Sequence, residues 1–279
     1  MRVRFGFHFS IAGGIDKSVL RCLELGCNAI QIFTGNPRSL FFGELKEEEV
    51  ASFKSLVVKH DIWPVVVHTN YLINLASRSR FLVSFESFYE ECKRSYLLGT
   101  DYVVLHPGSL RDNDRNLAIV NIAYAINRVL EDIPAITILI ENTSGAGSQL
   151  GSCVEDLVDI FGAVLYPDRL GLCFDTAHAF QAGYPIHTSY GFYEFLRMLD
   201  RRGLLDRVKL IHLNDSKTKF SSKVDRHHHL SSGYIGESLK VIAKFFSTIG
   251  VPIIMETPWG KEEDLRNLKI LLDWLELKY

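Results

Sequence analysis

One pattern recurs along the whole chain: a short apolar run is followed by an amphipathic segment. The apolar runs are rich in Val, Ile, Leu and Phe and show little alternation with polar residues, which is typical of strands buried on both faces. They occupy residues 3–8, 29–33, 64–68, 102–106, 136–141, 171–175, 208–212 and 252–256. The pattern therefore predicts eight parallel strands.

The segments between these runs repeat their apolar residues at steps of three and four, which predicts helices. Examples are residues 13–26, 47–60, 85–99, 116–130, 237–250 and 262–277. Several end in a glycine just before the next strand, and Gly26, Gly99 and Gly250 fit helix C-caps. A strand and a helix in every ~35 residues is the length of a βαβ unit, and parallel strands require such crossovers.

Eight such units in 279 residues predict an α/β fold, the (β/α)8 TIM barrel. No linker rich in Pro, Gly or Ser divides the chain, so we expect one barrel domain over residues 1–279. An open doubly wound sheet is the alternative.

Composition limits the function classes. No apolar run reaches membrane-spanning length, and the N-terminus "MRVRFGFHFS" is typical of a strand rather than a signal peptide, so we expect a cytoplasmic protein without membrane contact. The five cysteines form no Cys-x-x-Cys pair, which argues against a disulfide framework or a zinc ribbon. A net charge of −2 argues against a nucleic-acid substrate, unless the site carries bound cations.

Six consecutive predicted strands end in a side chain that can bind metal. These residues are His68, His106, Glu141, Asp175, His212 and Glu256. In a TIM barrel the carboxyl ends of the strands converge on the face that holds the active site. Buried imidazoles and carboxylates are costly when packed together unless they are paired or bound to metal. The set therefore predicts a metal centre at the carboxyl ends of the strands.

Three further residues join this set. His178 follows Asp175 by three residues, and Asp225 and His227 are two apart in "VDRHH", so an extended loop would project both to one side. Imidazoles and carboxylates without thiolates suit Zn, Mn or Fe. Nine ligands are too many for one ion and suit two or three, and a cluster of divalent cations favours phosphodiester hydrolysis.

The chain resembles the endonuclease IV family of apurinic/apyrimidinic endonucleases over essentially its whole length. The matching motifs include "GFHFSIAGG", "FTGNPRS", "VHTNYLINLAS", "IENTSGAGSQLG", "GLCFDTAHAFQAGY", "IHLNDSK" and "VDRHHH". The resemblance implies a DNA-repair enzyme that hydrolyses the phosphodiester 5′ to an abasic site and leaves a 3′-hydroxyl and a 5′-deoxyribose phosphate. It also implies trimming of blocked 3′ ends, a partner that is double-stranded DNA with abasic sites, no organic cofactor, and a monomer.

The family's three Zn²⁺ ions are implied as well, with Mn²⁺ as an alternative at one site. By this resemblance the ligands divide into His68 and His106 for the first ion, Glu141 as a bridge between the first and second, Asp175, His212 and Glu256 for the second, and His178, Asp225 and His227 for the third. Glu141 is also implied as the catalytic residue that orients the attacking water.

Loop residues of the family enter the minor groove, and Asn36, Arg38 and Tyr71 match those positions. Tyr71 is expected to stack on the base opposite the abasic gap. The chain departs from the family's usual residues at Ser39, Leu40, Ser232 and Tyr234.

Two other interpretations remain open. Metal-dependent sugar isomerases and epimerases use the same barrel and also place metal ligands at the ends of strands five to eight. His68, His106 and the pair Asp225 and His227 discriminate against them, because an isomerase has no evident need for a third metal. A non-catalytic DNA-damage binder is the third interpretation, and it would not require a bridging carboxylate.

Overall fold

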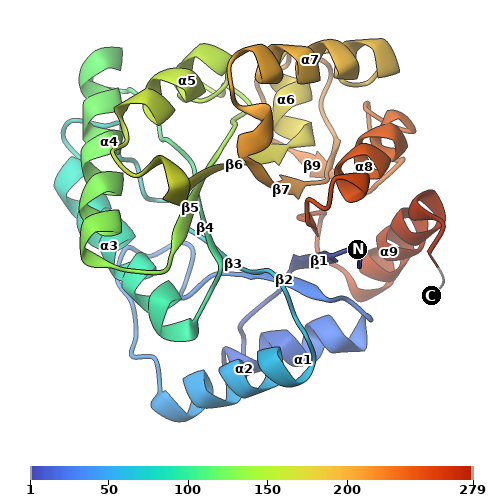
Figure 1. Cartoon of the computed structure of the whole chain (residues 1–279), viewed down its shortest axis with the longest axis horizontal. Coiled ribbons are helices and arrows are strands. Elements are labelled where there is room, and N and C mark those ends of the chain that lie inside the picture. The colour runs from blue at the N-terminus through green and yellow to red at the C-terminus, as the bar shows by residue number, and fades with distance from the viewer. Residues whose placement is uncertain (1, 278–279) are drawn as a thin grey trace.

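The computed structural model describes residues 2–277 and contains a closed barrel of parallel strands inside a ring of helices (Figure 1). The barrel strands are β1 (Phe5–His8), β2 (Ala29–Ile32), β3 (Val65–His68), β4 (Tyr102–Leu105), β5 (Thr137–Glu141), β6 (Leu170–Asp175), β7 (Val208–His212) and β10 (Ile253–Met255). Strand β1 pairs with both β2 and β10, so the sheet closes on itself. The (β/α)8 barrel is thereby confirmed and the open doubly wound sheet is wrong.

The helices cover the outside of the barrel (Figure 1). They are α1 (Asp16–Glu24), α2 (Glu47–Lys59), α3 (Phe81–Leu98), α4 (Arg115–Asp132), α5 (Val154–Ala163), α7 (Ser189–Arg201), α8 (Ser238–Thr248) and α9 (Lys261–Leu275). The short α6 (Thr176–Ala182) follows β6 directly, lies inside α7 at the carboxyl end of the barrel, and is buried. The predicted C-cap glycines Gly26, Gly99 and Gly250 all have positive φ, as expected. Helix α3 begins four residues before the segment that its apolar pattern indicated.

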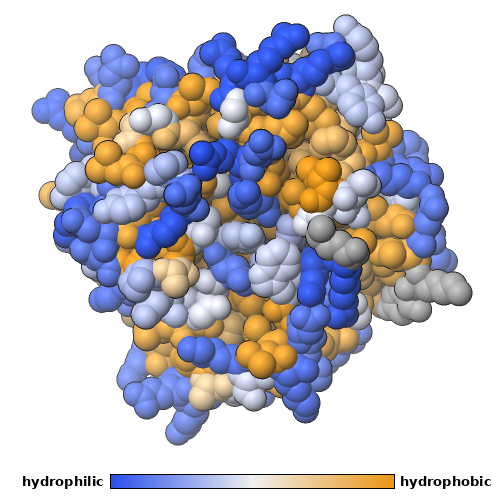
Figure 2. All heavy atoms as spheres, viewed as in Figure 1, coloured by the Kyte–Doolittle hydropathy of each residue, from blue (hydrophilic) through white to orange (hydrophobic). Residues whose placement is uncertain are grey.

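Hydrophilic side chains lie around much of the rim of the face in Figure 2, over the outer helices, with apolar patches mainly between them. Within residues 2–277, no helix combines the length and the apolar character needed to cross a bilayer. The terminal residues 1 and 278–279 of the expected domain lie outside the described residues.

A short antiparallel hairpin of β8 (Asp215–Ser216) and β9 (His227–His228) was not predicted, because the sequence indicated only an extended loop around His227. The Asp215 carboxylate is fully buried and accepts hydrogen bonds from the backbone N–H groups of Gly233 and Ile235, both at 2.9 Å. Asp215 at the start of the long segment after β7 is therefore hydrogen-bonded to Gly233 and Ile235 near its end.

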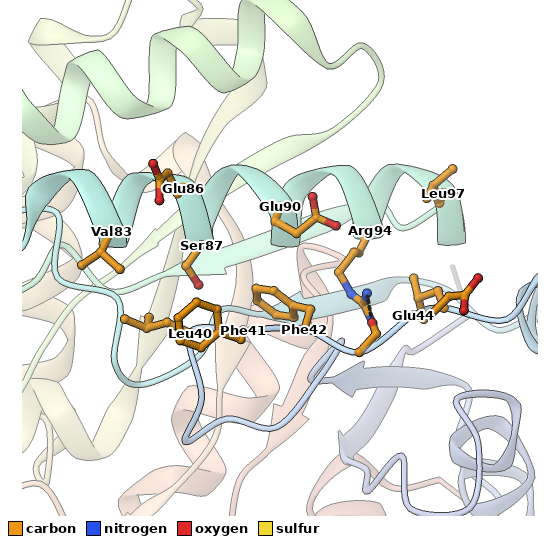
Figure 3. A pocket seen from close by; sticks show the side chains of 12 residues that line it. Leu40, Phe41, Phe42, Glu44, Val83, Glu86, Ser87, Glu90, Arg94 and Leu97 are labelled. Atoms are coloured by element: carbon orange, nitrogen blue, oxygen red, sulfur yellow. Dashed lines mark hydrogen bonds between the residues drawn. The ribbon is translucent and has the colours of Figure 1, made fainter.

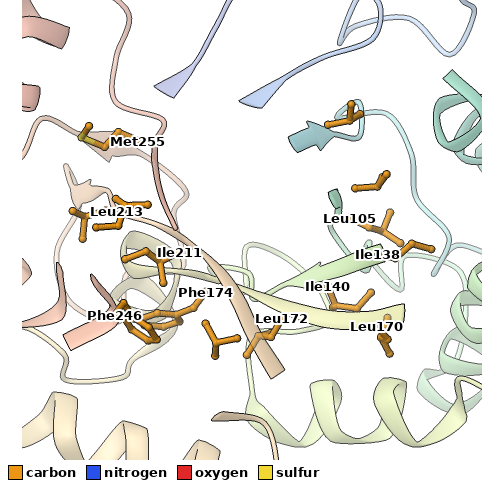
Figure 4. Packing of buried hydrophobic residues seen from close by; sticks show 14 of the residues in the cluster. Leu105, Ile138, Ile140, Leu170, Leu172, Phe174, Ile211, Leu213, Phe246 and Met255 are labelled. Carbon is orange, nitrogen blue, oxygen red and sulfur yellow. The ribbon is translucent and has the colours of Figure 1, made fainter. Parts of the chain in front are cut away.

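Alternate residues of the strands separate into an inner and an outer layer. The outer residues pack against the helices. Figure 4 shows this for Leu172 and Phe174 of β6, which lie near Phe246 of α8, and the centroids of the Phe174 and Phe246 rings are 5.8 Å apart. A second, separate apolar cluster takes one residue from each of seven strands: Ala29, Val66, Val104, Leu139, Cys173, Leu210 and Ile254. By the strand period of two, this second cluster fills the barrel interior, and Gly6 is the corresponding residue of β1.

A polar layer lies directly beyond this apolar interior. Two residues after each interior position, and therefore on the same side of its strand, stand His8, Gln31, His68, His106, Glu141, Asp175, His212 and Glu256. All eight strands thus contribute one polar side chain at the carboxyl end of the barrel.

We expect Gly6→Ala to lower the free energy of unfolding by about 1–3 kcal/mol, because inserting atoms into a packed interior forces the backbone to shift. A Cβ at Gly6 would lie 1.9 Å from the backbone oxygen of Ala29 on the paired strand. The measurement is urea unfolding of purified protein. Gly162→Ala in α5 is the matched control: a Cβ there meets nothing within 4 Å, so it should raise stability by about 0.5–1 kcal/mol. Equal effects of the two substitutions would contradict the interior assignment of Gly6.

Candidate metal centre

A cavity of about 450 Å³ opens at the carboxyl ends of the strands. Its lining includes six of the predicted metal ligands: His68, His106, His178, Asp225, His227 and Glu256. The remaining three, Glu141, Asp175 and His212, are wholly buried. The structure therefore places all nine predicted ligands at one end of the barrel, where the contacts below join them into one cluster.

Glu141 at the end of β5 lies at the centre of the cluster. Its Oε2 atom is 3.2 Å from His68 Nε2 and 3.0 Å from His106 Nε2. Its Oε1 atom is 3.1 Å from His178 Nδ1 and 3.2 Å from His212 Nδ1. Each carboxylate oxygen of Glu141 thus faces a different pair of imidazoles, which is the geometry expected of a bridging carboxylate.

The other carboxylates contact His212, His178 and His227. His212 Nδ1 is 3.2 Å from Glu256 Oε2, while His227 Nε2 is 3.5 Å from Asp175 Oδ2. Asp225 stands at the open side, with its side chain 41% exposed, 3.3 Å from His178 Nε2 and 3.6 Å from His227 Nε2.

Three combinations of these groups have one ligand atom per residue within 4.8 Å of one another. They are His68, His106 and Glu141; then Glu141, Asp175, His212 and Glu256; and then Asp175, His178 and His227. Neighbouring combinations share Glu141 or Asp175. The third differs from the expected trio in that it contains Asp175, whereas the expected ligand Asp225 lies beside it.

Four imidazoles have one ring nitrogen next to an oxygen of a neutral group. These contacts are His68 Nδ1 with Thr69 O at 2.7 Å, His178 Nδ1 with Asn142 O at 2.9 Å, His212 Nε2 with Gln31 Oε1 at 2.8 Å, and His227 Nδ1 with Glu256 O at 3.3 Å. Because these oxygens only accept, that nitrogen carries a proton, and the other nitrogen is left to bind a metal ion through its lone pair when it is not protonated. Such an outer oxygen is the usual companion of a metal-binding histidine.

The lone pairs on these rings fit a bound cation. The Nε2 atoms of His178 and His227 are buried and have no hydrogen-bond partner among residues 2–277. Both face carboxylate oxygens, and although burial opposes protonation, Asp175 and Asp225 raise the pKa of His178 well above its usual value, so the site favours a cation there, either a proton or a metal ion. The donor set of imidazole and carboxylate groups therefore fits divalent transition metals.

The charges of the carboxylates suit the same role. Although burial opposes ionisation, the nearby His106 and His212 hold the pKa of Glu141 well below its usual value. Burial also opposes ionisation of Glu256, but His212 and a hydrogen bond with His8 keep its pKa well below the usual value. Both groups are therefore anionic at neutral pH, the form that binds metal.

The three predicted DNA-contact residues lie in different places. Tyr71 lines the mouth of the cavity and is 67% exposed, and its ring centroid is 5.3 Å from Phe33 and 6.1 Å from His68. Asn36 and Arg38 are exposed on the loop after β2, outside the cavity. The structure thus brings Tyr71 to the cluster and leaves the other two at its periphery.

Sequence reasoning missed two members of the polar layer, His8 and Gln31. The side-chain nitrogen of Gln31 is 2.6 Å from Glu256 Oε1 and 2.9 Å from His8 Nδ1, so Gln31 joins two predicted ligands, His212 and Glu256. The signal was present, because His8 ends the first apolar run and Gln31 is the one polar residue within the second. Trp259, 86% exposed at the cavity, was also missed.

Comparison with known proteins agrees with this geometry. The model of the xylose isomerase-like TIM barrel family matches residues 19–277. A probable endonuclease 4 from Halothermothrix orenii is 39% identical over 96% of this chain and 99% of its own length. Apurinic-apyrimidinic endonuclease 1 from Saccharomyces cerevisiae is 34% identical over 99% of this chain and 77% of its own.

Solved structures give the same relationship. Endonuclease IV from Thermus thermophilus superimposes with a TM-score of 0.88 at 35% identity, covering 98% of this chain and 99% of that one. A D-tagatose 3-epimerase-like protein reaches a TM-score of 0.75 at 21% identity, which is a likeness of fold alone. The chain therefore belongs to the xylose isomerase-like TIM barrel family and, within it, to the endonuclease IV family of apurinic/apyrimidinic endonucleases.

Proposed function

We propose that this protein is a DNA-repair endonuclease that hydrolyses the phosphodiester 5′ to an abasic site and leaves a 3′-hydroxyl and a 5′-deoxyribose phosphate. The observation that carries the proposal is the set of three overlapping ligand groups, of which the first and second share Glu141 and the second and third share Asp175. A mononuclear site would use three or four of these side chains and leave the others buried without compensation. Relatives named endonuclease 4 and apurinic-apyrimidinic endonuclease support the same chemistry.

The proposed metal content is three Zn²⁺ ions, with Mn²⁺ as an alternative at one site. The proposed ligands are His68 and His106 for the first ion, Asp175, His212 and Glu256 for the second, His178, Asp225 and His227 for the third, and Glu141 between the first two. When bound, such ions supply an activated water and stabilise charge on the phosphate and the leaving oxygen. Three divalent cations would more than compensate the four carboxylates, which resolves the objection from the chain's negative net charge.

A side chain of the protein would then orient the attacking water. Glu141 is the proposed catalytic residue, because its two oxygens face separate pairs of imidazoles at the floor of the cavity.

An enzyme that acts at an abasic sugar must take that sugar out of the duplex. Tyr71, Asn36 and Arg38 are the proposed DNA contacts, with Tyr71 stacking beside the gap. We further propose that the enzyme trims blocked 3′ ends and acts as a cytoplasmic monomer with one barrel domain. All five cysteines are free thiols, which fits a reducing compartment.

Glu141→Gln should abolish turnover in a folded barrel, because a neutral amide bridges two cations poorly. We expect kcat to fall on the order of 10³-fold or more, since metal-assisted catalysis contributes several kcal/mol. The readouts are single-turnover cleavage of an abasic-analogue duplex, elemental analysis and circular dichroism. Glu131→Gln, which changes an exposed carboxylate on α4, is the control and should cleave normally. Near-normal kcat with full metal content in Glu141→Gln would refute the assigned role.

The double substitution His68→Ala/His106→Ala should remove the first ion alone. It leaves that ion with one protein ligand, too few for tight binding, so elemental analysis should show a loss of about one zinc per chain. Cleavage of abasic DNA should collapse, and added magnesium should not restore it, because magnesium prefers oxygen ligands. Unchanged metal content would mean that these histidines are ordinary strand-end residues. Sugar epimerisation by the parent protein, with DNA left intact, would replace the endonuclease proposal.

Tyr71→Ala should weaken the use of an abasic duplex more than the use of a single-stranded or frayed end. The expected difference is about 1–3 kcal/mol in kcat/KM, the usual contribution of stacking on one base. Tyr190→Ala is the matched control, because Tyr190 is 75% exposed on α7 and lies apart from the cavity. If both DNA substrates lose activity equally, Tyr71 only packs against Phe33 and its own loop.

A further inference from the structure

One face of α3 is buried yet polar. Ser84, Ser87, Glu91 and Arg94 follow one another at steps of three, four and three, so they share a face of the helix, and all four are buried. A buried helix face is normally apolar, and buried polar side chains must find hydrogen-bond partners. Here the partners belong to the two loops that carry the proposed DNA contacts.

Arg94 holds the loop after β2 at both ends. Its guanidinium donates to the backbone oxygen of Thr34 at 2.6 Å and to that of Gly43 at 2.8 Å, and it lies 5.2 Å from the centre of the Phe42 ring. Figure 3 shows Arg94 reaching from α3 to this loop. Thr34 and Gly43 bracket residues 35–42, the segment that contains Asn36 and Arg38. One planar side chain thus closes the loop by two charge-assisted hydrogen bonds.

The loop also packs on the core through Leu40 and Leu45. A cavity of about 520 Å³ separates its residues 40–45 from α3, and Figure 3 shows Leu40, Phe41 and Glu44 across the gap from the helix. Among the described residues, the side-chain hydrogen bonds from α3 to the backbone of this loop are the two that Arg94 donates.

The same face of α3 holds the loop after β3. The Glu91 carboxyl accepts the backbone N–H of Asn70 at 3.1 and 3.2 Å, and the Ser87 hydroxyl accepts the Asn70 side-chain amide at 3.2 Å. Asn70 Oδ1 in turn accepts the backbone N–H of Leu72 at 2.9 Å. The residues on both sides of Tyr71 are therefore fixed, and Ser84 adds a hydrogen bond from the N–H of Asn74.

We propose that this polar face of α3 holds both DNA-contact loops in their binding geometry before DNA binds, with Arg94 and Glu91 as positioning residues. The inference rests on the proposed function, because it takes Asn36, Arg38 and Tyr71 as DNA contacts. Ordering a loop during binding costs affinity, so a loop that is ordered beforehand binds more tightly. The polar face of α3 should therefore affect DNA binding and leave the rate of the chemical step unchanged.

The first test compares Arg94→Met with Lys93→Met. Both remove a cation and keep an unbranched stem, but Lys93 is exposed, and its contacts with Glu90 and the Tyr89 ring stay within α3. Hydrogen exchange is measured on the zinc-loaded protein without DNA, and cleavage kinetics are measured on a duplex with one abasic analogue. For Arg94→Met we expect exchange in residues 34–43 and the duplex KM each to rise about tenfold, or about 1.4 kcal/mol. Zinc content and kcat should stay at the parent values, and Lys93→Met should match the parent throughout.

The outcomes separate this inference from the proposed function. Parent-like exchange in Arg94→Met, or faster exchange with an unchanged KM, contradicts the proposed positioning role of the α3 face. A fall in kcat at unchanged KM also overturns it, because the effect would then lie at the metal centre. If the parent protein itself neither binds nor cleaves the duplex, the proposed function is wrong, and the exchange data alone decide whether Arg94 holds the loop.

The second loop gives an independent test through Glu91. Burial raises the pKa of the Glu91 carboxyl to about 8, so glutamine is a close replacement for it near neutral pH. Glu91→Ala should speed exchange at residues 70–72 and raise the duplex KM about tenfold, whereas Glu91→Gln should restore both. If Glu91→Ala does not fold, Ser87→Ala replaces it and should act in the same direction. A Glu91→Gln protein as impaired as Glu91→Ala, or no change in either, contradicts the positioning role.

Discussion

In a closed parallel barrel every second residue of each strand points inward, and all eight strand ends meet on one face. In this chain the inward positions first carry an apolar layer, which includes Leu139 and Ile254, and then a polar layer, which includes Glu141 and Glu256. A shift of one residue in any strand would turn its polar end residue toward the helices and its outer apolar residue into the site. The register that packs the core therefore also assembles the metal centre.

This arrangement concentrates charge where water is scarce. Glu141, Asp175 and His212 are wholly buried above an apolar interior, so their polar atoms must be satisfied by one another, by neighbouring oxygens or by bound cations. Gln31 shows how the chain meets part of this need, because one amide contacts both His212 and Glu256. The Nε2 atoms of His178 and His227 have no hydrogen-bond partner among the described residues, and they are the atoms that a bound cation would contact. The cost of burial thus favours occupancy by metal.

Much of this could be predicted from the sequence, because the barrel strands are short apolar runs whose last residue already reveals its chemistry. The hairpin that carries His227 could not, since it depends on Asp215 bonding to backbone groups at Gly233 and Ile235, residues far along the chain. The polar face of α3 was hidden for the same reason: Arg94 meets Thr34 across 60 residues of sequence. Helical periodicity shows that a face is buried, but it does not show what covers a polar one.

Three consecutive residues after β3 connect the ligand cluster with the mouth of the cavity. Thr69 accepts the ring proton of the predicted ligand His68, Asn70 is held by Glu91 of α3, and Tyr71 stands exposed at the cavity mouth. Since successive Cα atoms are about 3.8 Å apart, covalent geometry keeps Tyr71 within about 11 Å of His68 along the chain. The loop after β2 has no such link to a metal ligand, and Arg94 holds its backbone at Thr34 and Gly43 instead. Helix α3 thus contacts both loops. The covalent link to His68 restrains the loop after β3, whereas Arg94 holds the loop after β2 by hydrogen bonds.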